Sequence, residues 1–212
     1  ARWCWFGVGT ADAVPVGPDE RLPREFPYPA VLKPGDGAGS LSTRFVPAWD
    51  AGVVPQADRM RLEQYAPGTP ASVSALCGPA GPTVLRGCRQ IVSQDGHFLY
   101  LGGEFPLTRL EADRADQLAS RTLAVLPSTT GYVGIDMVLG PDSSGVDDRV
   151  LEINPRLTTS YVGLRRLARS NLAEAMLLAC CGDRCSLCFR AGGVQFHADG
   201  RVQVDSEAHV ER

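Results

Sequence analysis

The stretch Tyr28-Pro-Ala-Val-Leu-Lys-Pro-Gly-Asp-Gly-Ala-Gly-Ser40 runs from a short apolar strand into a glycine-rich loop, with Lys33 at the junction. Lys33 is the only lysine among the 21 Lys and Arg residues of the chain. Arginine serves ordinary surface roles equally well, so one retained lysine indicates a need for a compact, flexible ammonium group. Gly35, Gly37 and Gly39 allow the loop to turn several backbone N–H groups toward one anion. The stretch therefore predicts a phosphate-binding loop, with a plain strand-to-loop turn as the alternative.

The overall composition argues against several classes of protein. The chain has 212 residues, of which 44% are hydrophobic and 21% charged, as expected for a globular protein with one core or two small lobes. The formal net charge of −3 and the scattered arginines do not favour nucleic-acid binding. No apolar run reaches the roughly 18 residues that cross a bilayer, and the first residues lack the apolar segment of a signal peptide. We expect a cytoplasmic protein without nucleic-acid or membrane partners.

The cysteines suggest a reducing compartment and one candidate metal site. Seven cysteines are an odd number, which does not suit a complete disulfide framework. Four of them, Cys180, Cys181, Cys185 and Cys188, contain a C-x3-C-x2-C spacing. That spacing is compatible with an iron–sulfur cluster, or with zinc and His197 as the fourth ligand. The alternative is a helix end and turn that are rich in thiols.

Three oxygen-bearing side chains are predicted to converge on two neighbouring strands. Alternation along a strand sends Glu152 and Asn154 to the same face, and Asp136 lies on the strand before them. Carboxylate and amide oxygens suit a hard cation such as Mg2+, which completes its shell with water and nucleotide phosphates. Each residue also has an ordinary explanation: an exposed acid, a salt-bridge partner, or an asparagine that opens a turn.

A predicted strand ends in a turn that resembles a hinge between the lobes. The residues are Leu62-Glu-Gln-Tyr-Ala-Pro-Gly-Thr69, followed by Pro70. The backbone at such a strand end offers groups that can pair with the edge of an adenine base. A strand end followed by a simple turn is the alternative.

Hydrophobic alternation and turn residues predict an α+β protein of two lobes. Strands are expected at 30–32, 59–65, 71–77, 84–92, 97–101, 132–139 and 149–154, a final hairpin around 198–200, and helices at 111–126 and 172–180. The expected boundaries are an irregular approach segment (1–28), a first lobe with the glycine-rich loop (29–65), a hinge (66–70), a second lobe with the metal site (71–180) and a C-terminal hairpin extension (181–212).

The order of lysine and glycine loop, hinge strand, and paired oxygen-donor strands resembles the ATP-grasp superfamily, from about Tyr28 to Leu178. The stretches 71–74 and 87–103 are similar to its branch of small carboxylate–amine ligases related to tyramine–glutamate ligase. The resemblance implies the ATP-grasp fold, in which two α+β lobes hold the nucleotide between them. It also implies ATP and Mg2+ as cofactors.

The resemblance assigns roles to individual residues. Lys33 would contact the nucleotide phosphates, a loop containing Gly37, Gly39 and Ser40 would close over them, and Glu63, Gln64 and Tyr65 would receive adenine. Asp136, Glu152 and Asn154 would hold one or two Mg2+ ions, and Arg156 would face the transferred phosphoryl group or the acyl phosphate. Substrate contacts are expected from nearby loops, with Arg86, Gln90, Ser160, Tyr161 and Arg165 as candidates.

The implied activity is ATP-dependent ligation of a small-molecule carboxylate to a small-molecule amine, through an acyl phosphate and with release of ADP and phosphate. The chain departs from the family pattern in three places. Only Arg2, Arg21 and Arg24 precede Lys33 as basic residues, residues 1–28 do not resemble an N-terminal lobe, and residues 69–71 lack the acidic ribose contact. The alternatives are therefore a fragment, a non-catalytic ATP-binding module, or a subunit completed by a partner that carries the N-terminal lobe. A homo-oligomer or a partner subunit is the expected assembly.

Overall fold

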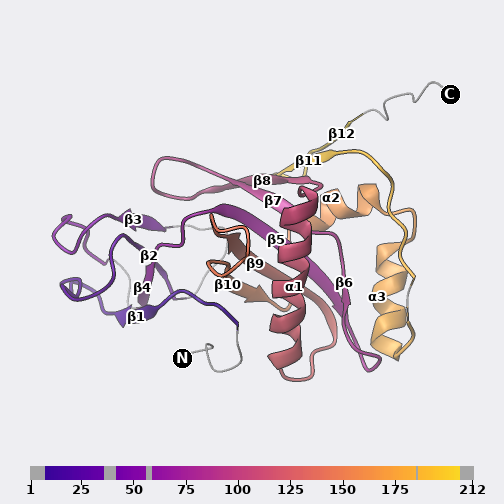
Figure 1. Cartoon of the computed structure of the whole chain (residues 1–212), viewed down its shortest axis with the longest axis horizontal. Coiled ribbons are helices and arrows are strands. Elements are labelled where there is room, and N and C mark those ends of the chain that lie inside the picture. The colour runs from indigo at the N-terminus through magenta and orange to yellow at the C-terminus, as the bar shows by residue number, and fades with distance from the viewer. Residues whose placement is uncertain (1–7, 36–41, 56–58, 185, 206–212) are drawn as a thin grey trace.

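Two antiparallel β-sheets organise the protein in the computed structural model, which describes residues 8–35, 42–55, 59–184 and 186–205 (Figure 1). The smaller sheet has four strands in the order β1-β4-β2-β3. Its strands are β1 (Ala13–Val16), β2 (Ala30–Pro34), β3 (Arg44–Val46) and β4 (Met60–Gln64). Buried aliphatic residues of these strands, including Leu32 and Leu62, form a core of their own. Residues 29–65, the predicted first lobe, supply β2, β3 and β4 of this sheet.

The first sheet also includes a strand from the segment 1–28, which the sequence indicated as irregular. β1 pairs with β4 in antiparallel register, with Val14 opposite Leu62. Pro15 lacks a backbone N–H, and the edge position of β1 accommodates such a residue because an edge strand has one unpaired side. The sequence did not indicate this strand because Gly and Pro are frequent around it.

The larger sheet has eight strands in the order β10-β9-β5-β7-β8-β11-β12, with β6 paired to β5. Its strands are β5 (Thr69–Cys77), β6 (Thr83–Val84), β7 (Cys88–Val92), β8 (Tyr100–Phe105), β9 (Gly131–Leu139), β10 (Arg149–Asn154), β11 (Val194–His197) and β12 (Val202–Val204). The predicted hairpin of 132–139 and 149–154 is present as β9 and β10. The single strand predicted over 84–92 is divided into β6 and β7.

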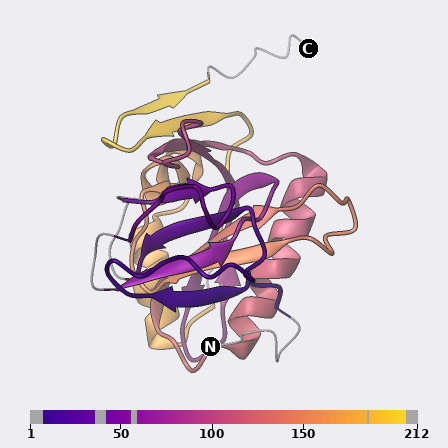
Figure 2. The ribbon, with the colours of Figure 1, turned by 90° about the vertical axis from the view of Figure 1, so that its left-hand side faces the viewer.

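Helices cover both faces of the larger sheet (Figure 2). α1 (Arg109–Val125) packs on alternate residues of β5 and β9, among them Val73 and Ile135. α2 (Ser160–Leu167) and α3 (Leu172–Cys181) pack on the opposite face, where Leu76 and Tyr132 point. Because side chains alternate along a strand, one sheet serves two separate hydrophobic cores. No helix within the described ranges is long and apolar enough to cross a membrane.

The helix termini show why two of the three helices were predictable. α1 begins with a capping box in which Thr108 and Glu111 satisfy each other's backbone N–H groups. The N-cap of α3 is Asn171, whose side chain accepts hydrogen bonds from the N–H groups of Ala173 and Glu174. Its C-cap is Gly182, which has a positive φ of 91°. α2 was not predicted, because its eight residues have no side-chain cap.

The segment 181–212, expected as an extension, is part of the second lobe as far as the structure describes it. β11 pairs with β8, so the final hairpin continues the larger sheet. Phe196 is 1% exposed and packs against Phe105 at a ring-centroid distance of 5.7 Å. A boundary at residue 181 would therefore divide a single hydrophobic core.

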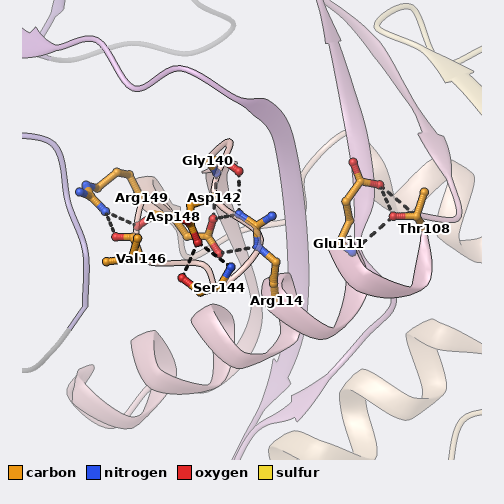
Figure 3. A network of polar contacts seen from close by, with 9 residues as sticks. All are labelled: Thr108, Glu111, Arg114, Gly140, Asp142, Ser144, Val146, Asp148 and Arg149. Atoms are coloured by element: carbon orange, nitrogen blue, oxygen red, sulfur yellow. Dashed lines mark hydrogen bonds and ion pairs between the residues drawn. The ribbon is translucent and has the colours of Figure 1, made fainter.

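A buried ion pair fixes the long connection between β9 and β10 (Figure 3). Arg114 of α1 forms a two-pronged contact with Asp148, in which Nε lies 3.2 Å from Oδ2 and Nη2 approaches Oδ1 more closely. Arg114 Nη2 also donates to the carbonyl of Gly140 at 2.8 Å, and Asp148 Oδ1 accepts from the Gly140 N–H at 2.8 Å. The two ends of the connection are thereby held on α1 and on each other.

Removing the Asp148 carboxylate should destabilise the protein strongly. The Asp148 side chain is 2% exposed and that of Arg114 is 11% exposed, so Asp148→Ala leaves a guanidinium and a backbone N–H without their partner. We expect the free energy of unfolding to fall by about 3 kcal/mol. Chemical denaturation measures this change. The control is Asp199→Ala, which removes an exposed ion pair with Arg201 and should leave stability unchanged; equal effects of the two substitutions would contradict the assignment.

Candidate functional site

The pairing of β9 with β10 brings the three predicted oxygen donors together. Glu152 lies opposite Asp136, and Asn154 lies opposite Gly134. A register irregularity between Val150 and Glu152 separates these pairs from the rest of the ladder. Asn154 Nδ2 donates to Asp136 Oδ2 at 3.1 Å, so the donors of the two strands are in direct contact.

A chain of polar contacts runs through Asp136. Gln90 Nε2, from β7, donates to Asp136 Oδ1 at 2.9 Å. Arg156 Nη2 donates to Asn154 Oδ1 at 3.0 Å on the other side. Ser72 lies opposite Asp136 on β5. Its buried hydroxyl lacks a well-aligned hydrogen bond to any described residue. Four residues, from β5, β7, β10 and the turn after β10, thus surround one buried carboxylate.

The environment of Asp136 makes its ionised form unfavourable. Burial raises the pKa of its carboxyl group, and the nearby Glu152 carboxylate raises it further. The Ser72 hydroxyl, the Gln90 amide and the charge of Arg156 act in the opposite direction, but do not compensate. A cation at this position would relieve both the burial of charge and the repulsion between the carboxylates.

The donor chemistry therefore fits Mg2+. Asp136 and Glu152 supply carboxylates, Glu152 is exposed to solvent, and Asn154 supplies an amide group. The orientation of Asn154 is the one feature that differs from a ligand set. Its oxygen accepts from Arg156 and its nitrogen faces Asp136, so ligation through oxygen requires the amide to leave Arg156.

The cysteine-based metal site finds no support within the described residues, although Cys185 lies outside them. Cys180, Cys181 and Cys188 are free thiols. No group of three or more His, Cys, Asp or Glu side chains is placed to hold a metal ion in the part of the chain that the structure describes.

Lys33 lies near the end of β2 and is paired within the first sheet. Its Nζ is 2.6 Å from Glu63 Oε2 on the neighbouring strand β4. Arg61 contacts the other oxygen of Glu63, whose side chain is 9% exposed. Within the described ranges, no hydrogen bond or ion pair joins Lys33 to the larger sheet. Gly37, Gly39 and Ser40, the predicted phosphate loop, lie outside the described residues.

The hinge residues are held by neighbouring backbone groups. The Gln64 N–H donates to Asp12 at 2.8 Å and the Tyr65 N–H donates to Pro29 at 2.9 Å. These two donors are therefore engaged, and an adenine edge would have to use other backbone groups of the hinge. Gly68, further along the hinge, has a φ of +145°, and a Cβ there would lie 2.1 Å from the Leu139 carbonyl oxygen. The hinge consequently packs directly on the end of β9.

An aromatic cluster joins the two sheets beside the hinge. The rings of Phe45 on β3, Tyr65 in the hinge and Phe98 in the β7–β8 loop lie with centroids 5.3 to 6.4 Å apart. The Phe45 N–H also donates to the Gly96 carbonyl at 2.7 Å. The β7–β8 loop therefore contacts the first sheet as well as belonging to the second.

The five candidate substrate contacts separate into different places. Gln90 contacts Asp136, and Tyr161 packs edge-on against Tyr132 with centroids 6.0 Å apart. Ser160 is buried beside Thr158. Arg86 lies over the Phe189 ring and donates to the Arg190 carbonyl, and Arg165 is exposed on α2. Only Gln90 has a direct hydrogen bond to the oxygen-donor residues.

Sequence reasoning missed Ser72, which lies beside Asp136. The signal was present in the alternation of β5, where Ser72 and Ser74 are polar residues on one face and Ala71, Val73 and Ala75 are apolar on the other. The pairing of β5 with β9, which puts Ser72 opposite Asp136, is a long-range contact that the sequence does not specify.

Comparison with known proteins shows the family. Residues 12–160 match a model described as the ATP-grasp domain, which is well over half of the chain. The chain belongs to the ATP-grasp family. Its match includes β1 to β10 and with them the oxygen donors, the hinge and Lys33.

Among ATP-grasp proteins, the chain is similar to two tyramine–L-glutamate ligases. It is 29% identical over 139 residues to the protein of Methanocaldococcus jannaschii, covering 65% of this chain and 41% of the relative. It is 25% identical over 178 residues to that of Methanocaldococcus fervens, covering 83% and 53%. The chain thus spans about half the length of the curated relatives it matches.

A solved structure supports the same ATP-grasp fold. N5-carboxyaminoimidazole synthase from Aspergillus clavatus, crystallised with ADP and 5-aminoimidazole ribonucleotide, superposes with a TM-score of 0.71. The match covers 90% of this chain and 52% of that one at 16% sequence identity. The likeness establishes the fold, because sequence identity this low does not carry substrate over.

The raised pKa of Asp136 predicts the sign of a pH dependence in this ATP-grasp protein. The folded state binds the Asp136 proton more tightly than the unfolded chain does. The resulting stabilisation is full below the unfolded-state pKa and is lost as the pH rises through the folded-state pKa. In magnesium-free buffer, the unfolding free energy of Asp136→Asn minus that of the wild type should therefore increase with pH across this window. Denaturation at a series of pH values measures it, and parallel curves would refute the assigned direction.

Proposed function

We propose that this chain catalyses the ATP-dependent joining of a small-molecule carboxylate to a small-molecule amine through an acyl phosphate. The observation that carries the proposal is the contact of Asp136 with Asn154, and of Asn154 with Arg156, on the paired strands β9 and β10. The family match and the names of the tyramine–L-glutamate ligases support the same reaction class.

The proposed reaction has two steps. A carboxylate oxygen of the acid attacks the γ-phosphorus of ATP, and the bond to the bridging oxygen breaks to release ADP. The amine nitrogen then attacks the acyl carbon, loses a proton, and phosphate leaves with the electron pair of the broken C–O bond. The product is an amide, and ATP supplies the free energy that amide formation in water requires.

The residues of this chain contribute mainly charge and positioning. Lys33 binds the phosphates as a point charge once it exchanges Glu63 for the nucleotide, and Arg156 binds the transferred phosphoryl group. Asp136, Glu152 and Asn154 would hold Mg2+, which, when bound, neutralises charge on the phosphate oxygens. Little covalent chemistry is asked of the protein in phosphoryl transfer, so such preorganised charges account for most of the catalysis.

The proposed activity is tested directly by product release. The protein is incubated with ATP, Mg2+, and panels of carboxylic acids and amines, starting with L-glutamate and tyramine, the pair named in the relatives. Release of ADP and phosphate that depends on both substrates supports the proposal. Absence of turnover with every pair tested, with nucleotide binding retained, would contradict it.

A second candidate function is nucleotide binding without turnover. The existing contacts of the proposed ligand-binding groups favour this function. Lys33 forms an ion pair with Glu63, and the Asn154 oxygen accepts a hydrogen bond from Arg156. Calorimetry with the non-hydrolysable analogue AMP-PNP separates the two functions. Binding without turnover supports the module, and the absence of binding contradicts both functions. A partner that completes the substrate site remains part of this second proposal.

Substitution of the phosphate and metal residues should abolish turnover while leaving the fold intact. We expect Lys33→Ala and Glu152→Gln each to lower kcat/KM by at least about 100-fold, because each removes a charge that acts on the phosphates. Steady-state ADP release measures the effect, and circular dichroism checks folding. The matched control is Arg201→Ala, which removes an exposed cation far along the sheet on β11–β12. Full activity in Lys33→Ala would place the phosphate site elsewhere.

A further inference from the structure

The segment that carries Arg156 leaves the larger sheet beside Gly134 and returns to the sheet at the same residue. In the β9–β10 ladder, Asn154 lies opposite Gly134. Four residues later the methyl group of Thr158 occupies the space above the same glycine, since a Cβ on Gly134 would lie 2.4 Å from Thr158 Cγ2. The segment 154–158 is therefore anchored at both ends on one position of β9, with Arg156 in its middle.

The requirement for glycine at this position is one of space. Gly134 does not have the positive φ that would itself disfavour a side chain. An alanine would suit the strand conformation, and glycine inside a strand is otherwise a disadvantage. What excludes a methyl group is the Thr158 side chain, whose Cγ2, Oγ1 and Cβ would lie 2.4, 3.2 and 3.4 Å away.

The returning end of the segment is held by a cluster of hydroxyl groups. Thr158 Oγ1 lies 2.8 Å from the Oγ of buried Ser160, and the Thr158 carbonyl accepts from the Tyr161 N–H at 3.0 Å. Beneath them, the Tyr132 hydroxyl donates to Ser74 Oγ at 2.6 Å. Thr158 therefore joins the start of α2 to the surface of the sheet.

Arg156 depends on this anchoring for its position. Within the described residues, all of its hydrogen bonds are made inside its own segment: its N–H and side chain bond to Asn154, and Nη1 donates to the Leu157 carbonyl at 3.3 Å. Its side chain is otherwise exposed. Where the ends of the segment rest on the sheet therefore decides where the guanidinium lies relative to Asp136.

We propose that Gly134 and Thr158 are positioning residues, which hold the segment 154–158 so that Arg156 and Asn154 face the site next to Asp136. The anchoring itself follows from the contacts of Gly134 and Thr158, and its effect on catalysis rests on the proposed function. Displacements of about 1 Å at a reacting group lower rates by about 100-fold, so a small shift of this segment has a large effect.

Three variants test the proposal: Gly134→Ala, Thr158→Ser and the double variant. Gly134→Ala forces Thr158 away and should lower kcat by about 100-fold with less effect on the KM for ATP, because Lys33 and the hinge are untouched. Thr158→Ser removes the clashing Cγ2 but keeps the hydroxyl near Ser160. The double variant should therefore recover kcat to within about threefold of Thr158→Ser alone. Thr130→Ser, at an exposed threonine before β9, is the matched control.

A second measurement does not depend on catalysis. Hydrogen exchange of the Arg156 and Tyr161 amides, followed by NMR, should become faster in Gly134→Ala and return to the wild-type rate in the double variant. If the wild type proves to have no turnover while exchange shows this loss and rescue, the proposed function fails and the anchoring stands. If exchange and kcat in Gly134→Ala equal those of the wild type, or if Thr158→Ser does not rescue them, the positioning role is wrong.

Discussion

The antiparallel pairing of β9 with β10 is the constraint on which the rest of the structure depends. It places Glu152 opposite Asp136 and Asn154 opposite Gly134, and the contact between Asn154 and Asp136 follows from that register. A shift of one residue would turn these side chains to the α1 face, which is apolar and closed. The Arg114–Asp148 pair secures the same register from outside the ladder, because it fixes both ends of the intervening connection on α1. A helix on one face of the sheet thus supports polar chemistry on the other face.

The arrangement also shows how the protein tolerates a buried carboxylate. Asp136 is surrounded by neutral donors from Gln90 and Asn154 and by the positive charge of Arg156, yet its pKa remains raised because burial and Glu152 dominate. Natural proteins retain such unfavourable groups where binding offsets the cost. Lys33 and Arg156, the two cations assigned to the nucleotide in the proposed function, are engaged by Glu63 and Asn154. The proposed contacts of Lys33 and Arg156 with the nucleotide therefore replace existing internal contacts.

Local signals predicted much of the fold and indicated which polar residues of β9 and β10 lie together. Each of these features depends on residues that are close in sequence. Examples are the strands β9 and β10, the capped ends of α1 and α3, and the placement of Glu152 and Asn154 on one face of β10. What the sequence did not reveal depends on distant partners. β1 is a strand only because β4 lies beside it, β11 belongs to the second core only through β8, and Ser72 meets Asp136 only through the pairing of β5 with β9. The residues next to Gly134 do not indicate why a glycine is needed there, because the Thr158 methyl group that excludes a side chain follows a turn.

The contact between the β7–β8 loop and β3 has a mechanical consequence. Gly68 has no space for a side chain beside the Leu139 carbonyl, so the covalent connection between the sheets lies directly against the end of β9. The Phe45–Gly96 hydrogen bond and the ring of Phe98 provide a second attachment, which holds the edge strand β3 of the small sheet. The segment that leads into β1 adds a third attachment, because Thr10 bridges Val150 of β10 and the Val150 N–H donates to the Gly9 carbonyl at 2.8 Å. The small sheet therefore cannot move as a unit without disturbing its contacts to β10, to the end of β9 and to the β7–β8 loop.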